Sequence, residues 1–139
     1  MPTDEFLTGV QTFMGMPHSP DPTGAKAAIL GIPFDCGHHP VRVGARMGPA
    51  AIRKESTLVR PYQPPFGDFH VVEALAAVDC GNVDVALDDI VETFRRIEGA
   101  LARILDAGAI PVTFGGDGAV TLPQLRAVHA KYPDLVVLH

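Results

Sequence analysis

The sequence predicts an α/β fold with a mainly parallel sheet, and two observations support this class. Short, continuous apolar runs alternate along the chain with longer segments in which apolar residues recur every three or four positions. Continuous runs are typical of parallel strands buried on both faces, whereas the longer spacing is typical of amphipathic helices. Because helices and strands alternate, right-handed crossovers are expected to place neighbouring strands parallel to one another.

The first half of the chain predicts an irregular arm, a strand, a short helix and a second strand. Residues 1–25 are rich in Pro, Gly and Thr and are assigned to the arm, whereas 26–139 are assigned to one α/β domain. Residues 27–32 are continuously apolar, as expected of a buried strand. Proline at the start of 49–54 favours the first turn of a helix. Residues 71–78 are expected to form the second strand, although part of this run also fits a helix.

The clearest predicted helix begins near Asp89 and ends at residues 107–109. Asp89 and Glu92 have the spacing of a capping box, in which side chains accept hydrogen bonds from the free N–H groups of the first turn. Apolar side chains recur on one face, which predicts that this face is buried. They are Ile90, Phe94, Ile97, Leu101, Ile104 and Leu105. The arginines of the other face, Arg95, Arg96 and Arg103, are interpreted as a solvated helix surface.

The second half of the chain continues the alternation. Residues 110–114 predict a strand, 121–131 a helix, and 135–138 the beginning of another buried strand. The sequence stops at His139, directly after this last run. A free carboxylate at the end of a central strand is unusual, so we expect the chain to be the N-terminal part of a larger domain.

Composition excludes several classes of function. The formal net charge is −5 and no run of Lys or Arg stands out, so neither nucleic acid nor an anionic membrane is an expected partner. The start of the chain is acidic rather than signal-like, and no apolar run approaches the roughly 20 residues of a membrane span. Two cysteines, Cys36 and Cys80, are too few for a disulfide-built secreted domain. We therefore expect reduced thiols and a cytoplasmic location.

The turn Gly115-Gly116-Asp117-Gly118 is the most informative local pattern. It follows a predicted strand and precedes a helix, which places it at the sheet edge where α/β proteins bind ligands. Glycines there allow a tight turn, and N–H groups at a helix start can hold an anion. The spacing fits neither a P-loop nor a dinucleotide loop. The turn is therefore interpreted either as a structural turn in which Asp117 accepts local N–H bonds, or as a Rossmann-like anion site.

The wider sequence resembles the ureohydrolase (arginase/agmatinase) family, in its agmatinase-like branch. The resemblance runs through six segments in order and covers nearly the whole chain. These segments are TFMGMP (12–17), LGIPFDCG (30–37), GARMGPAAIR (44–53), DCGNV (79–83), FGGDGAVTLPQLRA (114–127) and LVVLH (135–139). The resemblance implies a three-layer α/β/α sandwich of the arginase type, of which this chain is the N-terminal half.

The resemblance also implies a chemistry, the hydrolysis of a small cationic guanidino compound to urea and an amine. In the family a pair of divalent metals, usually manganese and in some cases nickel, makes hydroxide available near neutral pH. The family motif reads Gly-Gly-Asp-His, but Gly118 replaces the metal-binding histidine here. We therefore assign no catalytic residue and no metal ligand to this chain. The alternative function is a non-catalytic homologue that acts as a structural or regulatory subunit.

The remaining site predictions concern supporting residues at this edge. Asp117, with Gly115 and Gly116, is expected to steady the turn. Asp35 is expected either to orient a neighbouring loop or simply to form a local turn.

A further loop is expected to select the substrate through His38, His39 and Arg42, whereas Arg46 is expected to tie its loop to neighbouring carbonyl groups. Adjacent histidines usually point in different directions, so we do not assign a metal to His38 and His39. By resemblance, the protein is expected to form a homo-oligomer, either a trimer or a hexamer.

Overall fold

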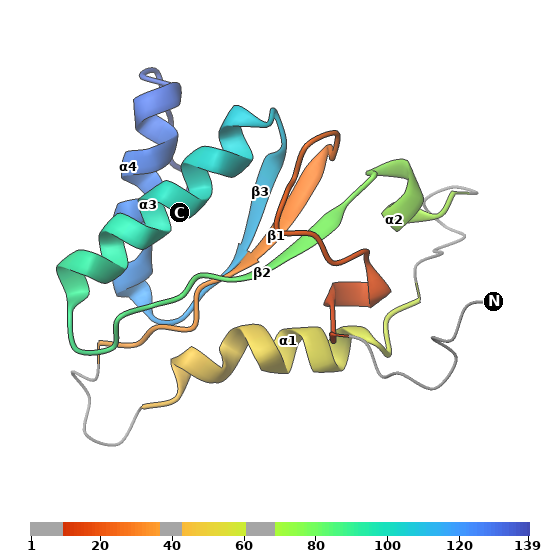
Figure 1. Cartoon of the computed structure of the whole chain (residues 1–139), viewed down its shortest axis with the longest axis horizontal. Helices are drawn as coiled ribbons and strands as arrows, with labels where there is room; N and C mark the ends of the chain where they lie inside the picture. Colours follow the sequence, from red (N-terminus) through yellow and green to blue (C-terminus); the bar gives the residue numbers. More distant parts are fainter. Residues whose placement is uncertain (1–9, 37–42, 61–68) are drawn as a thin grey trace.

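A computed structural model describes most of the chain, in three stretches: residues 10–36, 43–60 and 69–139. Three parallel strands form its sheet, in the order β2-β1-β3 (Figure 1). They are β1 (Ala27–Gly31), β2 (Val78–Asn82) and β3 (Ile110–Phe114). The predicted parallel α/β arrangement is confirmed.

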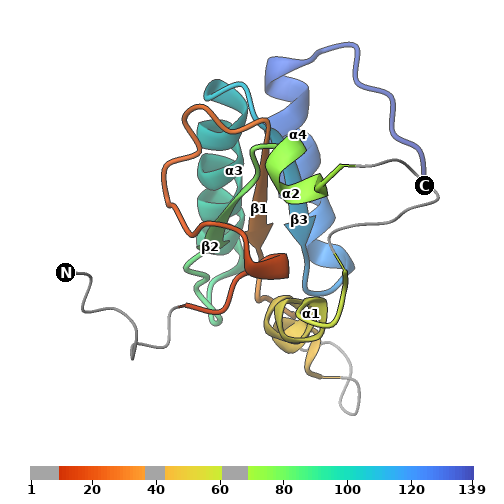
Figure 2. The same cartoon turned by 90° about the vertical axis from the view of Figure 1, so that its right-hand side faces the viewer.

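Helices cover both faces of this sheet. Helices α3 (Ile90–Asp106) and α4 (Thr121–Lys131) pack together on one face, and α1 (Gly48–Ser56) lies on the other, as Figures 1 and 2 show. The shorter elements in the described part of the chain are α2 (Val71–Ala74) and three 3₁₀ turns: η1 (Phe13–Gly15), η2 (Ala45–Met47) and η4 (Gly118–Val120). Within the described residues, no helix has both the length and the apolar character needed to cross a membrane.

Strand β1 is the centre of the core because its side chains serve both faces of the sheet. Ala28 and Leu30 face α3, where they join a cluster with Ile97 and Leu101. On the other face, Ile29 belongs to a smaller cluster with Met16 and Ala77. All five residues of β1 are buried, as the continuous apolar run predicts. Burial of each large aliphatic side chain contributes about 1.5–3 kcal/mol relative to exposure.

Helix α3 begins and ends where the sequence indicates. The Asp89 carboxylate accepts a hydrogen bond from the Glu92 N–H at 3.0 Å, which caps the first turn. The chain leaves the helix at Gly108, whose positive φ of 78° suits glycine. Glu92 does not complete the capping box, since its side chain binds arginines instead.

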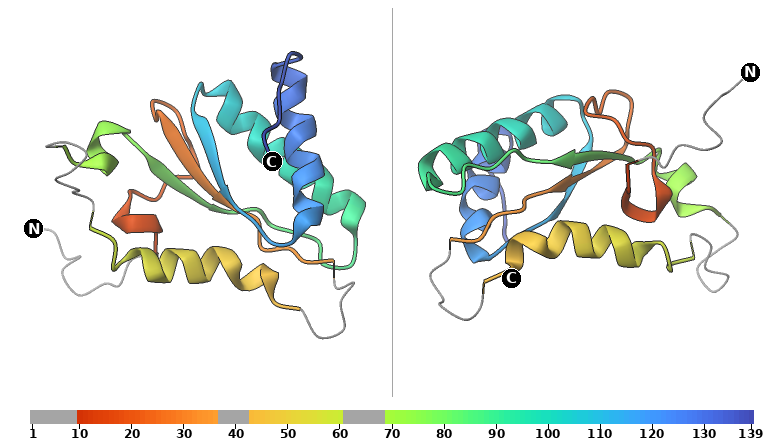
Figure 3. Two further views of the ribbon diagram at one scale, coloured as in Figure 1. Left: turned by 180° about the vertical axis from the view of Figure 1, so that it is seen from behind. Right: turned by 60° about the horizontal axis from the view of Figure 1, so that its bottom comes forward.

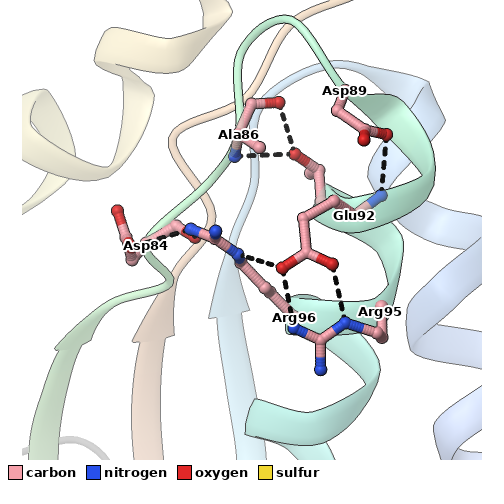
Figure 4. A network of polar contacts seen from close by, with 7 residues as sticks. Asp84, Ala86, Asp89, Glu92, Arg95 and Arg96 are labelled. Carbon is pink, nitrogen blue, oxygen red and sulfur yellow. Dashed lines mark hydrogen bonds and ion pairs between the residues drawn. The ribbon is translucent and has the colours of Figure 1, made fainter.

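The arginines near the start of α3 are more than a solvated surface. Glu92 binds Arg95 and Arg96, and these pairs lower the pKa of Glu92 to about 2 (Figure 4). Arg96 also donates to the carbonyl and the carboxylate of Asp84, at 2.8 and 2.7 Å. The Thr93 hydroxyl exchanges two hydrogen bonds with the backbone of Ala86. Together these contacts fasten the loop between β2 and α3.

The predicted strand at 71–78 is wrong. Residues 71–74 form α2, and the strand β2 begins only at Val78. Ala76 adopts a positive φ of 42° between these two elements. Pairing decides the outcome, because the segment that lies beside β1 is 78–82, with Ala28 opposite Val78 and Ile29 opposite Asp79.

The strand predicted at 135–138 is also wrong. These residues have no regular structure and pair with no strand of the described chain. Val136 and Leu138 are 79% and 93% exposed. An apolar run becomes a strand only when a neighbouring strand satisfies its backbone groups and buries its side chains.

The described part of the arm, residues 10–25, is irregular but packs against β2. Phe13 N–H donates to the Asp79 carboxylate at 2.9 Å, and Phe114 contacts the Phe13 ring edge-on. His18 forms a parallel bridge with Asp79, in which the Asp79 N–H donates to the Pro17 carbonyl. The arm therefore extends one edge of the sheet.

Candidate functional site

The candidate site lies where β1 and β3 end side by side. Gly31 is opposite Phe114 at the last paired position, and Ile32 N–H donates to the Phe114 carbonyl at 2.8 Å. The segments that leave the two strands, 32–36 and 115–118, therefore start next to each other. Figure 3 shows this edge of the sheet, with α4 beginning beside it. This is the carboxyl edge of a parallel sheet, where ligand sites of this fold class are found.

The turn after β3 packs directly on the segment after β1. The Asp117 N–H donates to the Phe34 carbonyl at 3.1 Å. A Cβ atom on Gly116 would lie 1.5 Å from that same carbonyl oxygen, which no real contact allows. On the other side of the turn, a Cβ atom on Gly48 would lie 3.0 Å from the Gly115 carbonyl oxygen. Glycine at 116 is therefore required by the close approach of two backbones.

Position 118 has no such requirement. A Cβ atom there would meet nothing within 4 Å, and Gly118 does not have a left-handed φ. Gly118 starts the η4 turn, which Asp117 caps. The fold would thus accept a side chain at 118, and the glycine is not explained by packing or by backbone strain.

The Asp117 carboxylate joins the two segments. Its Oδ1 accepts from the Ala119 N–H at 3.0 Å, and its Oδ2 accepts from the N–H and the thiol of Cys36, both at 2.9 Å. Burial raises the pKa of Asp117, but these hydrogen bonds outweigh it and leave that pKa below its usual value. The carboxylate is therefore held ionised, as an acceptor that fixes the turn.

Asp35 organises the next loop in a similar way. Its buried carboxylate accepts from the N–H groups of Gly44 and Arg46, at 3.2 and 3.1 Å. The Arg46 guanidinium adds two contacts, at 3.0 Å from Nε and 2.6 Å from Nη2. The bonds from Arg46 hold the pKa of Asp35 well below its usual range. The prediction that Arg46 binds carbonyl groups is wrong, because a buried carboxylate is the stronger acceptor for a guanidinium.

The described residues at this carboxyl edge of the sheet do not fit a metal pair. Gly118 supplies no ligand atom, and Asp117 and Asp35 spend their oxygens on N–H, thiol and guanidinium donors. Within the described residues, no three His, Cys, Asp or Glu side chains meet in an arrangement that could hold a metal ion. The predicted substrate-loop residues His38, His39 and Arg42 lie outside the described residues.

The sequence did not predict a buried ion pair between α1 and β2. Arg53 of α1 and Asp79 of β2 are only 6% and 1% exposed, and the guanidinium binds both carboxylate oxygens at 2.8 Å. Arg53 also donates to the Asn82 side chain at 2.7 Å and to the Gly81 carbonyl at 2.9 Å. Arg53 and Asp79 both lie in segments that carry the resemblance, but nothing local shows that they meet.

This ion pair connects the arm and α1 to β2. Asp79 also accepts from the N–H groups of Phe13 and Gly81, each at 2.9 Å. Burial raises the pKa of Asp79, but Arg53 and these N–H groups together lower it below its usual value. Arm, α1 and β2 also line a cavity of about 300 Å³ at this point. The pair has a structural effect, because it fixes the arm and α1 on the sheet.

The described arrangement shapes the carboxyl edge of the sheet. Two ionised carboxylates fix three segments at the carboxyl edge of the sheet, and each carboxylate accepts at least three hydrogen bonds.

Comparison with known proteins identifies the fold and the family. A model of the arginase family matches residues 25–139. Human mitochondrial guanidino acid hydrolase is 38% identical over 141 residues, which cover 99% of this chain and 40% of the relative. Guanidinobutyrase from Pseudomonas aeruginosa is 37% identical over 134 residues, covering 94% of this chain and 41% of the relative.

A solved structure agrees with these sequence relatives. Proclavaminate amidino hydrolase from Streptomyces clavuligerus superimposes with a TM-score of 0.80 at 32% identity, covering 89% of this chain and 40% of that protein. The chain thus spans about 40% of the length of the relatives it matches. The predicted arginase-like α/β sandwich and the predicted family are confirmed, and the chain belongs to the arginase family.

Proposed function

We propose that the protein to which this chain belongs is an agmatinase-like amidinohydrolase, which hydrolyses a guanidino compound to urea and an amine. Relatives named for the hydrolysis of guanidino acids and guanidinobutyrate support this substrate class. The substrate would be a small cation, and the acidic net charge of −5 is compatible with its approach.

The observation that carries the proposal is the turn at residues 115–118. The close packing of Gly116 and the capping carboxylate of Asp117 support a shaped turn at the carboxyl edge of the sheet, where proteins of this fold class bind ligands, and residue 118 belongs to that turn.

The proposed reaction needs a divalent metal. The family resemblance implies a manganese pair, or nickel, that would supply hydroxide near neutral pH. The residues described here do not provide that site, because position 118 is glycine. Any metal ligands of the protein must therefore come from residues other than those at this turn.

The test measures urea release by the protein as the cell makes it. Agmatine, 4-guanidinobutyrate and arginine are supplied in turn, with Mn²⁺ or Ni²⁺, and bound metal is counted by mass spectrometry. Turnover of one substrate supports the proposal. Absence of urea from all three, by protein that is folded by circular dichroism, would reject it and favour the non-catalytic homologue.

Two variants at one position sharpen the test. Gly118→His places an imidazole in open space at the turn, and Gly118→Ala is the matched control without a ligand atom. We expect only Gly118→His to raise metal content and urea release. If the two variants behave alike, the loss of the imidazole is not what limits metal binding.

We further propose that the protein is a homo-oligomer, either a trimer or a hexamer. The family resemblance supports this, and light scattering on the purified protein would distinguish monomer, trimer and hexamer.

A further inference from the structure

Cys36, in the irregular segment that follows β1, makes an unusual contact for a cysteine. Its thiol lies 2.9 Å from Oδ2 of Asp117, a residue 81 positions further along the chain. Its own N–H donates to the same oxygen, also at 2.9 Å. The carboxylate is thus bound by one side chain and one backbone group of the same residue.

Of these two hydrogen bonds, only the one from the thiol depends on which amino acid occupies position 36. Any residue at 36 would supply the N–H, but only a side chain with a donor can supply the second bond. Bonds to an ionised acceptor are stronger than bonds between neutral groups. The orientation of the Asp117 carboxylate therefore depends on the identity of residue 36.

The orientation of Asp117 in turn sets the start of η4. When Oδ2 faces Cys36, Oδ1 faces the Ala119 N–H and caps the turn that begins at Gly118. If Oδ2 lost its thiol donor, the carboxylate would gain freedom to rotate, and the cap at Ala119 would weaken. Cys36 thereby acts on residue 118 from a different loop.

We propose that Cys36 is a positioning residue of the candidate site, which fixes the Asp117 carboxylate and through it the turn at 117–119. The inference rests on the proposed function only in taking residue 118 as part of the site. A packing role alone would make different predictions, since volume and not hydrogen bonding would then matter at position 36.

Amide hydrogen exchange at Ala119, measured by NMR on the full chain, tests the proposal. We expect Cys36→Ala to speed this exchange by about three- to tenfold, the usual effect of one hydrogen bond. Cys36→Ser keeps a donor and should restore exchange to within about twofold of the parent chain. Cys80→Ala, at the half-buried cysteine of β2, is the matched control and should leave Ala119 unchanged.

A second measurement does not depend on a destabilising substitution. In Cys80→Ala, Cys36 is the one remaining cysteine of the sequence, so methyl methanethiosulfonate can block it selectively with a methylthio group that has no hydrogen-bond donor. The blocked sulfur has no hydrogen to donate, and we expect Ala119 to exchange as fast as in Cys36→Ala. Amides of α3 should keep their rates, which excludes global unfolding.

Two results would overturn the inference. One is equal exchange at Ala119 in Cys36→Ala and Cys36→Ser, which would indicate packing alone. The other is an unchanged rate after the thiol is blocked. Neither result depends on enzymatic turnover, so a failure here is distinct from the failure of the proposed function, which would show as absent urea release.

Discussion

Two glycines in one turn, Gly116 and Gly118, should respond oppositely to the same substitution. The added Cβ of Gly116→Ala would lie 1.5 Å from the Phe34 carbonyl oxygen and 2.6 Å from its carbon. Both are backbone atoms, so no side-chain rotation relieves the clash. The turn must instead move away from the segment that follows β1.

The size of the effect follows from what that movement breaks. Overpacking of a well-packed site costs about 1–3 kcal/mol. Separation of the two segments also removes the bond from the Asp117 N–H to the Phe34 carbonyl, a net loss of about 1 kcal/mol. We therefore expect Gly116→Ala to lower the free energy of unfolding by about 2–4 kcal/mol.

Gly118→Ala is the matched control. It adds the same methyl group in open space, without a left-handed φ, and should raise the free energy of unfolding by about 0.4–1 kcal/mol. Urea unfolding followed by circular dichroism should separate the midpoints of the two variants by about 1–3 M. Equal midpoints, or a stable Gly116→Ala, would refute the argument that two backbones meet at this turn.

The other predictions concern the buried pair, pH and metal. Asp79→Asn should destabilise the chain by about 3–5 kcal/mol in urea unfolding, because it leaves the Arg53 charge buried without its partner; a loss below about 1 kcal/mol would contradict this. Asp35, Asp79 and Asp117 have lowered pKa values, so they stabilise the fold above the ordinary carboxyl pKa of 3.8. That stability should be lost as pH falls below about 4. The urea midpoint of unfolding, measured at a series of pH values, checks this; a midpoint that does not change down to about pH 2 would contradict the prediction. If the chain had a Mn²⁺ site with a Kd of about 10 µM, about 1 mM Mn²⁺ would raise its free energy of unfolding by about 2.7 kcal/mol. We expect no such shift in thermal unfolding for this chain, since Gly118 offers no ligand.

The local sequence pattern correctly predicted helices and strands that are buried in the same way along their whole length. The apolar run at 27–32 became β1, because a central parallel strand is buried on both faces. The periodic apolar face beginning at Ile90 became α3. The runs at 71–78 and 135–138 failed, because a strand depends on a partner that local sequence does not specify.

In the candidate site, too, some features could be predicted from local sequence and others could not. The glycines and Asp117 were predictable, because a turn between strand and helix needs small residues and a cap. The partner of Asp117 was not, since Cys36 lies 81 positions away and has no distinguishing local pattern. Asp35 was predicted either to orient a loop or to form a local turn, and its pairing with the Arg46 guanidinium was not predicted.

The sequence by itself therefore determined the class of fold, the family and the missing imidazole at 118, because these depend on residue types in a fixed order. Only the tertiary structure decided which carboxylate meets which donor. Contacts such as Arg53 with Asp79, or Cys36 with Asp117, form between segments that are distant in sequence. Their geometry depends on how strands pair and how helices pack, and pairing is a property of the whole fold rather than of any one segment.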